Sequence, residues 1–194
     1  MNKKVFIIGK GSIGLRQSQI LKRIGYKVIF VRRKIRNKKN EINFSEIKKE
    51  NINFFIICNP TALHEETLKK LIKYNKPILV EKPLFHKTNN KLIKTIKNKK
   101  LIFTAYQMRF DPRIVKLKKM INNKKNLVSY LSWQTYMPNW HKKENYINSY
   151  ASIKELGGGA ILTLSHEIDL AIYLFWKIKK IHIFKLNNNL NINV

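Results

Sequence analysis

The segment VFIIGKGSIG, residues 5–14, decides the fold of this 194-residue chain. It begins with a continuous apolar run that suits a strand covered on both faces, and a glycine-rich turn follows at once. Glycines permit a tight turn and let backbone N–H groups approach a pyrophosphate at the positive end of the next helix. A helical pattern that begins at Ser12 supplies this helix. The segment therefore predicts a dinucleotide-binding strand, turn and helix, with an ordinary glycine turn as the alternative.

Further apolar runs follow the first one, and helical patterns separate them. The runs occupy residues 28–31, 54–57, 78–80 and 101–103, and helical spacing covers residues 12–24, 44–50, 64–74 and 88–97. Parallel strands need such helical crossovers, so the alternation predicts an α/β fold with a Rossmann-like, doubly wound parallel sheet. We place this dinucleotide-binding domain at residues 1–112.

The pattern changes in residues 113–194. Helical spacing covers residues 112–121 and 160–175, and residues 127–136 and 178–186 resemble strands. An irregular stretch rich in aromatic residues leads to the glycines at 157–159, which break the chain before the last helix. We expect a partial α+β domain here, with an incomplete antiparallel sheet.

The composition indicates a globular chain with an unusual charge. Hydrophobic residues make up 44% of it, and 40 Lys and Arg against 11 Asp and Glu give a net charge of +29. Lysines are spread along the whole chain, as in a solvated basic surface; binding of a polyanion through residues 32–39 is the alternative. No apolar run is long enough to cross a bilayer, and the single cysteine excludes a disulfide framework and a cysteine-based zinc cage. We expect a cytoplasmic protein with no metal site, no membrane contact and no specific nucleic-acid partner.

The end of the second predicted strand carries Arg32 and Arg33. A fold that binds NAD(H) would offer an acid there to the ribose 2′-hydroxyl. Guanidinium groups at this place can instead hold a 2′-phosphate through charge-assisted hydrogen bonds. We therefore prefer NADP(H) to NAD(H) as the cofactor. In so basic a chain, two arginines without a role are the alternative.

Polar residues follow the third and fourth predicted strands, at the edge where an open α/β sheet binds its ligands. Residues 58–64 read CNPTALH, and residues 81–83 read EKP after the next strand. Farther along, His166 and Asp169 lie three residues apart in a predicted helix and therefore share one face. His166 can exchange a proton near neutral pH, and a packed histidine bonded to the backbone is the alternative.

Together these pieces resemble the Gfo/Idh/MocA oxidoreductases, the family of glucose–fructose oxidoreductase and inositol dehydrogenase. The motifs GKGSIG, CNPTALHEE, EKPL, YQMRFDP and GGG…SHEID occur in the order and spacing of that family. The stretch from Tyr136 to Ala151 also resembles a sugar-handling branch. The resemblance implies an NAD(P)-dependent dehydrogenase that acts on CH–OH groups in sugar metabolism. Family members often pair through the sheet of the second domain, so the resemblance allows a homo-oligomer, and the sequence leaves the oligomeric state open because this sheet is incomplete.

The resemblance assigns roles to individual residues. Lys82 and His166 would be the catalytic pair, with Lys82 holding the reacting oxygen and His166 taking its proton. With the two arginines, the cofactor-binding residues are then Gly9, Gly11, Ser12, Ile13, Gly14, Arg32, Arg33, Asn59, Pro60, Thr61, His64, Glu81 and Lys82. A small, sugar-like substrate would contact Arg109, Trp140, His141, Tyr146, Tyr150 and Asp169.

Departures from the family pattern define the alternative function. Thr163 stands where the sugar-handling branch has an aspartate, and Trp176 stands where the family turns with a glycine. Family members are also much longer, with a broad antiparallel sheet in the second domain. The alternative is therefore a C-terminally truncated, catalytically inactive nucleotide-binding remnant of such an enzyme.

Overall fold

The computed structural model describes residues 3–37, 39–47, 52–97, 101–122, 126–133 and 152–175, together with residues 124, 136, 147, 179, 180 and 182. The chain divides into two compact units, Met1–Ala105 and Tyr106–Val194. Residue 112, after which the sequence placed a boundary, begins a helix of the second unit. Within the described residues, no helix has the length and apolar character needed to cross a membrane.

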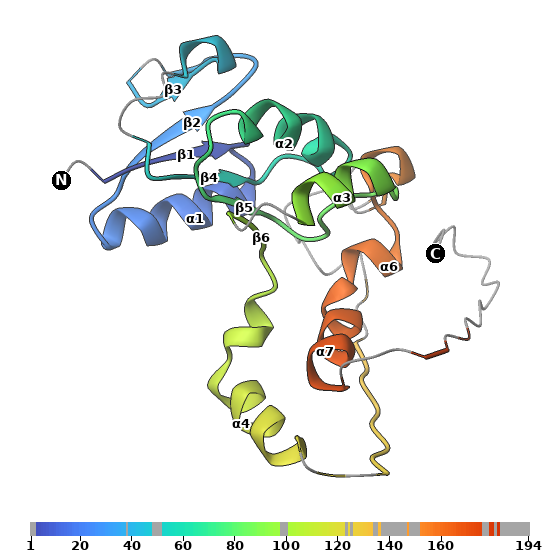
Figure 1. The fold of residues 1–194 in the computed structure, drawn as a ribbon. Helices are drawn as coiled ribbons and strands as arrows, with labels where there is room; N and C mark the ends of the chain where they lie inside the picture. The colour runs from blue at the N-terminus through green and yellow to red at the C-terminus, as the bar shows by residue number, and fades with distance from the viewer. Residues whose placement is uncertain are drawn as a thin grey trace. The chain divides into compact units, whose positions relative to one another are not determined.

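One parallel sheet forms the centre of the first unit (Figure 1). Its strands are β1 (Lys4–Ile8), β2 (Lys27–Val31), β3 (Glu41–Ile42), β4 (Phe54–Ile57), β5 (Ile78–Val80) and β6 (Ile102–Thr104). They are ordered β3-β2-β1-β4-β5-β6, and every neighbouring pair is parallel. Val5 of β1 lies opposite Val28 of β2 on one side and Phe54 of β4 on the other. This is the strand order of the dinucleotide-binding, doubly wound fold, so the predicted α/β fold class is confirmed.

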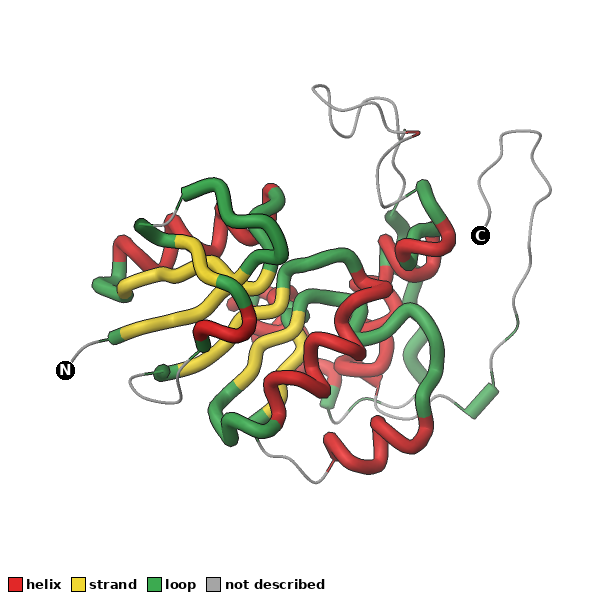
Figure 2. The backbone as a smooth tube through the Cα atoms, turned by 90° about the horizontal axis from the view of Figure 1, so that it is seen from above, coloured by secondary structure: helices red, strands yellow, loops and turns green. Residues whose placement is uncertain are grey.

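Helices cover both faces of this sheet, as Figure 2 shows in red on either side of the yellow strands. Successive side chains of a strand point to opposite faces. Phe6 packs in one core with Leu68 and Leu92, whereas Ile7 packs with Leu21 in another. The apolar run of β1 is therefore buried on both sides, as predicted, whereas Phe103 of the edge strand β6 is 53% exposed. The helical elements are α1 (Ser12–Arg23), η1 (Phe44–Glu46), η2 (Thr61–Leu63), α2 (His64–Ile72) and α3 (Asn90–Lys97).

The region around β3 differs from the sequence prediction. The helix predicted over residues 44–50 is only the single 3-10 turn η1, which reciprocal hydrogen bonds between Asn43 and Glu46 cap. Ile47 already has extended backbone, with φ −71° and ψ 105°, and residues 48–50 lie outside the described residues. Strand β3 was not predicted, because two residues are too few to show a period.

The regular elements described in the second unit are all helical. They are η3 (Gln107–Phe110), α4 (Pro112–Ile121), η5 (Lys154–Leu156), α6 (Ala160–Thr163) and α7 (Ser165–Phe175). The sequence predicted a single helix over residues 160–175, but Leu164, with φ −104° and ψ 38°, separates α6 from α7.

The strand predicted over residues 127–136 is absent from its described positions, 127–133 and 136. Val128 is fully exposed there. Alternation alone does not make a strand, because a strand needs a hydrogen-bonded neighbour. The neighbour that the sequence suggested, residues 178–186, lies mostly outside the described residues.

Candidate active site

The carboxyl ends of the parallel strands bring several loops to one edge of the first unit. Gly9 follows β1, Arg32 follows β2, Cys58 follows β4 and Glu81 follows β5. The strand order reverses between β1 and β4, and an open α/β sheet binds its ligands in the crevice at such a point. The structure therefore gathers at one edge the loops that carry the predicted cofactor-binding residues.

Close backbone approaches require glycine at two positions, one in the loop after β1 and one in the first turn of α1. Gly9 has φ +103°, and a Cβ there would lie 2.7 Å from the Cys58 carbonyl oxygen. A Cβ on Gly14 would collide with the Gly9 carbonyl oxygen. Gly11 differs, because a Cβ there would meet no described atom within 4 Å and its φ of −78° suits any residue. Gly9 and Gly14 therefore shape the turn, whereas Gly11 leaves space in front of the helix.

This space lies at the N-terminus of α1. Gly11 is the N-cap and supplies no side-chain cap, and the first turn holds no acidic residue. Gly11, Ser12 and Ile13 are exposed. Helix N-termini bind phosphate because their first N–H groups lack intrahelical partners and the helix dipole is positive there. The loop therefore fits the pyrophosphate of a dinucleotide.

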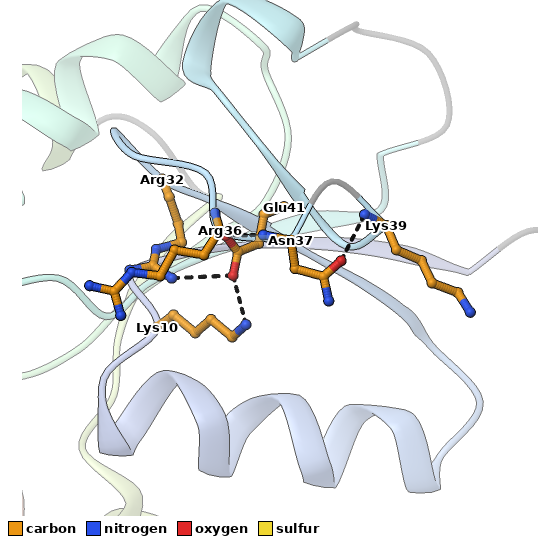
Figure 3. A network of polar contacts seen from close by, with 6 residues as sticks. All are labelled: Lys10, Arg32, Arg36, Asn37, Lys39 and Glu41. Carbon is orange, nitrogen blue, oxygen red and sulfur yellow. Dashed lines mark hydrogen bonds and ion pairs between the residues drawn. The ribbon is translucent and has the colours of Figure 1, made fainter.

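Glu41 lies at the centre of a polar network beside the glycine loop (Figure 3). Its Oε1 accepts hydrogen bonds from Lys10 Nζ at 2.7 Å and from Arg32 Nη1 at 3.2 Å. Its Oε2 accepts from the backbone N–H groups of Arg36 at 2.7 Å and Asn37 at 3.3 Å. These donors, Lys10 above all, lower the pKa of Glu41 to about 2. Glu41 is therefore an ionised carboxylate at neutral pH, although its side chain is 0% exposed.

The two arginines after β2 have different surroundings. The Arg32 side chain is 24% exposed and is tied to Glu41. The Arg33 side chain is 80% exposed, and its Nη2 lies 4.0 Å from Glu66 Oε2. A guanidinium has five N–H donors, so Arg32 keeps others beyond the one that Glu41 accepts. Arg32 is therefore a positioned cation, and Arg33 is a solvated one.

His64 joins the loops that follow β4 and β5. It is buried, and its Nδ1 lies 3.0 Å from the Pro83 carbonyl oxygen while its Nε2 lies 2.9 Å from that of Asn59. Both partners are acceptors, so a neutral ring can donate to only one of them. Burial lowers the pKa of His64, and the carbonyl oxygens oppose that shift. The structure gives His64 a bracing role, and its direct contact with a cofactor stays a prediction.

Asn59 presents a polar atom that the described residues leave unsatisfied. Its Nδ2 donates to Thr67 Oγ1 at 2.8 Å, and its Oδ1 is buried with no hydrogen-bond partner in the described part of the chain. A buried oxygen without a donor costs free energy, and a ligand hydroxyl or amide would supply one. The next residues, Pro60 and the buried Thr61, begin the turn η2. Asn59 therefore fits the ribose or amide of the nicotinamide half.

Glu81 and Lys82 follow β5 and are half-buried. Gln17 of α1 donates from Nε2 to Glu81 Oε1 at 3.2 Å. Burial raises the pKa of Glu81 above its ordinary value, and burial together with the Glu81 charge raises the pKa of the Cys58 thiol. Cys58 is therefore a protonated, unreactive thiol at neutral pH. Lys82, like Lys10 and Arg32, is a half-buried cation at this edge of the sheet.

His166 lies in the first turn of α7, in the second unit. The Tyr106 ring packs edge-on against it with centroids 6.0 Å apart, and Gln107 Nε2 lies 3.5 Å from His166 Nε2. Thr163 is buried at the end of α6. Because Leu164 interrupts the helix, Thr163 and His166 do not lie along one continuous helical face.

Arg109 and Asp169 form a bidentate ion pair between η3 and α7. Arg109 Nε lies 2.9 Å from Asp169 Oδ2, and Arg109 Nη2 lies 2.5 Å from Oδ1. The Asp169 side chain is 5% exposed, and the guanidinium also lies 5.3 Å from the centroid of the Tyr173 ring. This pair joins two elements of the second unit, and its contact with a substrate stays a prediction.

The other predicted substrate contacts, Trp140, His141, Tyr146 and Tyr150, lie outside the described residues, as does Trp176. Sequence reasoning missed Lys10 and Glu41. Lys10 is one of many lysines, and Glu41 gave no signal because its burial depends on a strand too short to predict.

Comparison with known proteins identifies the family. The sequence model of the Gfo/Idh/MocA oxidoreductases, described as an oxidoreductase family with an NAD-binding Rossmann fold, matches residues 3–107, more than half of the chain. The chain belongs to this family. It is 27% identical over 131 residues to the uncharacterized oxidoreductase YrbE of Bacillus subtilis (strain 168), a match that covers 63% of this chain and 35% of YrbE.

Solved structures share the fold of this family member. The WlbA (WbpB) dehydrogenase from Thermus thermophilus, solved with NAD and UDP-GlcNAcA, is 18% identical with a TM-score of 0.63, over 89% of this chain and 62% of that one. The myo-inositol 2-dehydrogenase from Lactobacillus plantarum is 22% identical with a TM-score of 0.52, over 63% of this chain and 42% of that one. The chain thus spans between 35% and 62% of the length of these relatives.

Proposed function

We propose that this chain is an NADP(H)-preferring oxidoreductase. It transfers hydride between the nicotinamide and a hydroxyl or keto group of a sugar or sugar derivative. The observation that carries the proposal is the arrangement at one sheet edge of an open helix N-terminus at Gly11 and a half-buried cation at Lys82. The first suits a dinucleotide, and the second suits a substrate oxygen that gains negative charge.

The preference for NADP(H) rests on the surroundings of Glu41. An NAD(H) site presents a carboxylate to the ribose 2′-hydroxyl. Glu41 is the carboxylate beside the end of β2, and its side chain is sealed from solvent. Arg32 and Lys10 are each about one quarter exposed and face that solvent instead. A 2′-phosphate is therefore favoured over a 2′-hydroxyl.

Five of the predicted residues would then bind the cofactor or take part in the reaction. The backbone N–H groups of Ser12 and Ile13 would hold the pyrophosphate, and Asn59 would hold the nicotinamide-side ribose. The bound nicotinamide would accept or supply the hydride. Lys82 would hold the substrate oxygen and stabilise its developing negative charge. His166 would take the hydroxyl proton on oxidation and return it on reduction.

The relatives support the proposed substrate class. WlbA was solved with a nucleotide sugar, and the Lactobacillus enzyme acts on myo-inositol, so both handle polyhydroxylated rings. We assign substrate binding and pairing of two copies to the second domain, residues 113–194. The tyrosine, tryptophan and histidine residues at 140–150 would contact the sugar there. Because Thr163 replaces an acid, we expect proton transfer through His166 to be weaker than in a relative with aspartate.

Titration of the purified chain with NADPH and NADH, followed by cofactor fluorescence at physiological salt, tests the proposal. We expect saturable binding at least about tenfold tighter for NADPH, and then hydride transfer with one member of a sugar panel. Equal affinities would refute the NADP(H) preference. A folded sample that binds neither cofactor would indicate the inactive remnant, and salt-sensitive binding of polyanions without dinucleotide binding would indicate the basic-surface alternative.

A further inference from the structure

We propose that Glu41 is a positioning residue for cofactor choice, which holds Lys10 and Arg32 together as a two-cation site for the adenosine 2′-phosphate. The inference rests on the proposed function and adds Lys10 and Glu41 to its residues. It concerns the adenosine half of the cofactor alone and is independent of the reaction at the nicotinamide.

Lys10 and Arg32 share one oxygen atom of Glu41. Lys10 Nζ at 2.7 Å and Arg32 Nη1 at 3.2 Å both approach Oε1 of Glu41. Because both lengths end on one atom, the two nitrogens are no farther apart than the sum of those lengths. Two cations so close would repel each other, and the ionised carboxylate between them removes that repulsion. Glu41 therefore keeps together two charges that would otherwise separate into solvent.

The three side chains come from three different segments of the first unit. Lys10 comes from the glycine loop after β1, Arg32 follows β2, and Glu41 begins β3. Lys10 Nζ also lies 5.2 Å from the centroid of the buried Phe30 ring, a cation–π contact with β2. Figure 3 shows the side chains of Lys10 and Arg32 converging on Glu41. The network therefore joins the pyrophosphate loop to the end of β2, where the adenosine ribose would lie.

A ligand can reach the two cations but not the carboxylate. The backbone N–H groups of Arg36 and Asn37 occupy the second oxygen of Glu41, and the carboxylate has no exposed surface. The side chains of Lys10 and Arg32 keep 25% and 24% exposure. A ligand thus meets two cations backed by one carboxylate, a site with net positive charge. Such a site binds a phosphate dianion and gains little from a ribose hydroxyl.

A purely structural role for Glu41, as an anchor of the loop between β2 and β3, is the competing explanation. It predicts that loss of Glu41 lowers stability without changing the preference between ligands that differ only in the 2′-phosphate. The pair 2′,5′-ADP and 5′-AMP provides this comparison, because both contain the adenosine half and neither contains nicotinamide.

The experiment measures calorimetric affinities of both nucleotides for the full chain and for the variants Glu41→Gln, Lys10→Gln and Lys39→Gln. Lys39 is the matched control, since it lies in the same loop, is exposed, and points away from Glu41 in Figure 3. We expect the unmodified chain to prefer 2′,5′-ADP by at least about tenfold. Glu41→Gln should remove most of this preference and change 5′-AMP affinity by less than about twofold. Lys10→Gln should lower the preference by about threefold or more, and Lys39→Gln should leave it unchanged.

An unchanged preference in a folded Glu41→Gln protein would overturn the inference. If that variant fails to give a folded circular-dichroism spectrum, Lys10→Gln decides, because it keeps the contact between Arg32 and Glu41; an unchanged preference there overturns the inference equally. If the unmodified chain binds both nucleotides alike, the NADP(H) preference of the proposed function is itself wrong. The two failures are therefore distinguishable.

Discussion

The Nδ1 atom of His64 lies 3.0 Å from the carbonyl oxygen of Pro83, the residue that directly follows Lys82. The other ring nitrogen of His64 reaches the carbonyl oxygen of Asn59. One buried side chain thus couples the loop that carries Lys82 to the loop that carries Asn59. Correct placement of both candidate site residues depends on a group that can itself titrate.

We expect this histidine to make the fold sensitive to acid. Burial lowers the pKa of His64 in the folded chain below its ordinary value of 6.5, so the unfolded chain binds the proton first as the pH falls. The contribution of neutral His64 to the free energy of unfolding is complete above about pH 6.5. It is lost as the pH falls toward the lower folded pKa, with a slope of at most about 1.4 kcal/mol per pH unit.

Urea unfolding between about pH 7.5 and 5.5 measures this slope. The variant His64→Gln should lack the part of the pH dependence that comes from protonation of His64. Glu41 does not interfere, because its pKa of about 2 places its own loss of stability below its ordinary value of 4.5. Parallel slopes in the two proteins would assign the acid sensitivity to another group.

Gly14 and Gly11 should respond differently to alanine. A Cβ on Gly14 meets the Gly9 carbonyl oxygen, so Gly14→Ala should cost about 1–3 kcal/mol of unfolding free energy despite the better helix propensity of alanine. Gly11→Ala meets no described atom and should change stability by less than about 0.5 kcal/mol. It should nevertheless weaken dinucleotide binding by about tenfold or more, because the methyl group enters the space for the pyrophosphate. Thermal unfolding and cofactor titration of both variants separate the two effects, and full cofactor affinity in Gly11→Ala would place the pyrophosphate elsewhere.

Lys82→Ala should remove hydride transfer and leave cofactor binding nearly intact. Loss of a group that stabilises a developing oxyanion lowers kcat by about 10²–10³-fold. The cofactor contacts at the glycine loop are untouched, so the NADPH affinity should change by less than about threefold. Lys87→Ala is the matched control, since Lys87 is exposed in the same loop. Single-turnover rates and fluorescence titrations measure the two quantities, and a normal rate in Lys82→Ala would assign the oxygen-binding role to another residue.

Asp169→Asn should destabilise the chain through Arg109. The pair is bidentate and Asp169 is buried, but the Arg109 side chain is 38% exposed, which reduces the effect by solvent screening. We expect a loss of about 1–3 kcal/mol in unfolding free energy. Arg109→Lys should lose a similar amount, because an ammonium cannot make the planar, two-bonded contact. A double-mutant cycle by urea unfolding measures the coupling, and additive losses would show that the pair contributes no coupling energy.

Most strands followed from the sequence because burial on both faces leaves a continuous apolar run, and the edge strand β6 keeps such a run although Phe103 is 53% exposed. Residues 5–8, 28–31, 54–57, 78–80 and 101–103 are apolar throughout, and the structure places a strand at each. Glu41 could not be predicted, since only its pairing with Phe30 places this charged residue in the sheet. The break at Leu164 was hidden for the opposite reason, because apolar spacing continues through it. Tertiary contacts, which a single sequence does not display, decided both.

Arg32 and Arg33 were equivalent in the sequence, and the structure separates them. Arg32 is held by Glu41, and its remaining N–H donors are available. Arg33 is solvated, and its contact with the Glu66 carboxylate is long, at 4.0 Å. We expect Arg32→Gln to weaken NADPH binding by about tenfold or more and NADH binding by less than about threefold. Arg33→Gln should weaken NADPH binding by less than about threefold, and that loss should disappear at high salt, because a solvated charge acts only through screened attraction. Fluorescence titrations of both variants at two ionic strengths test this ranking, and equal, salt-sensitive losses would show that the two arginines contribute charge alone.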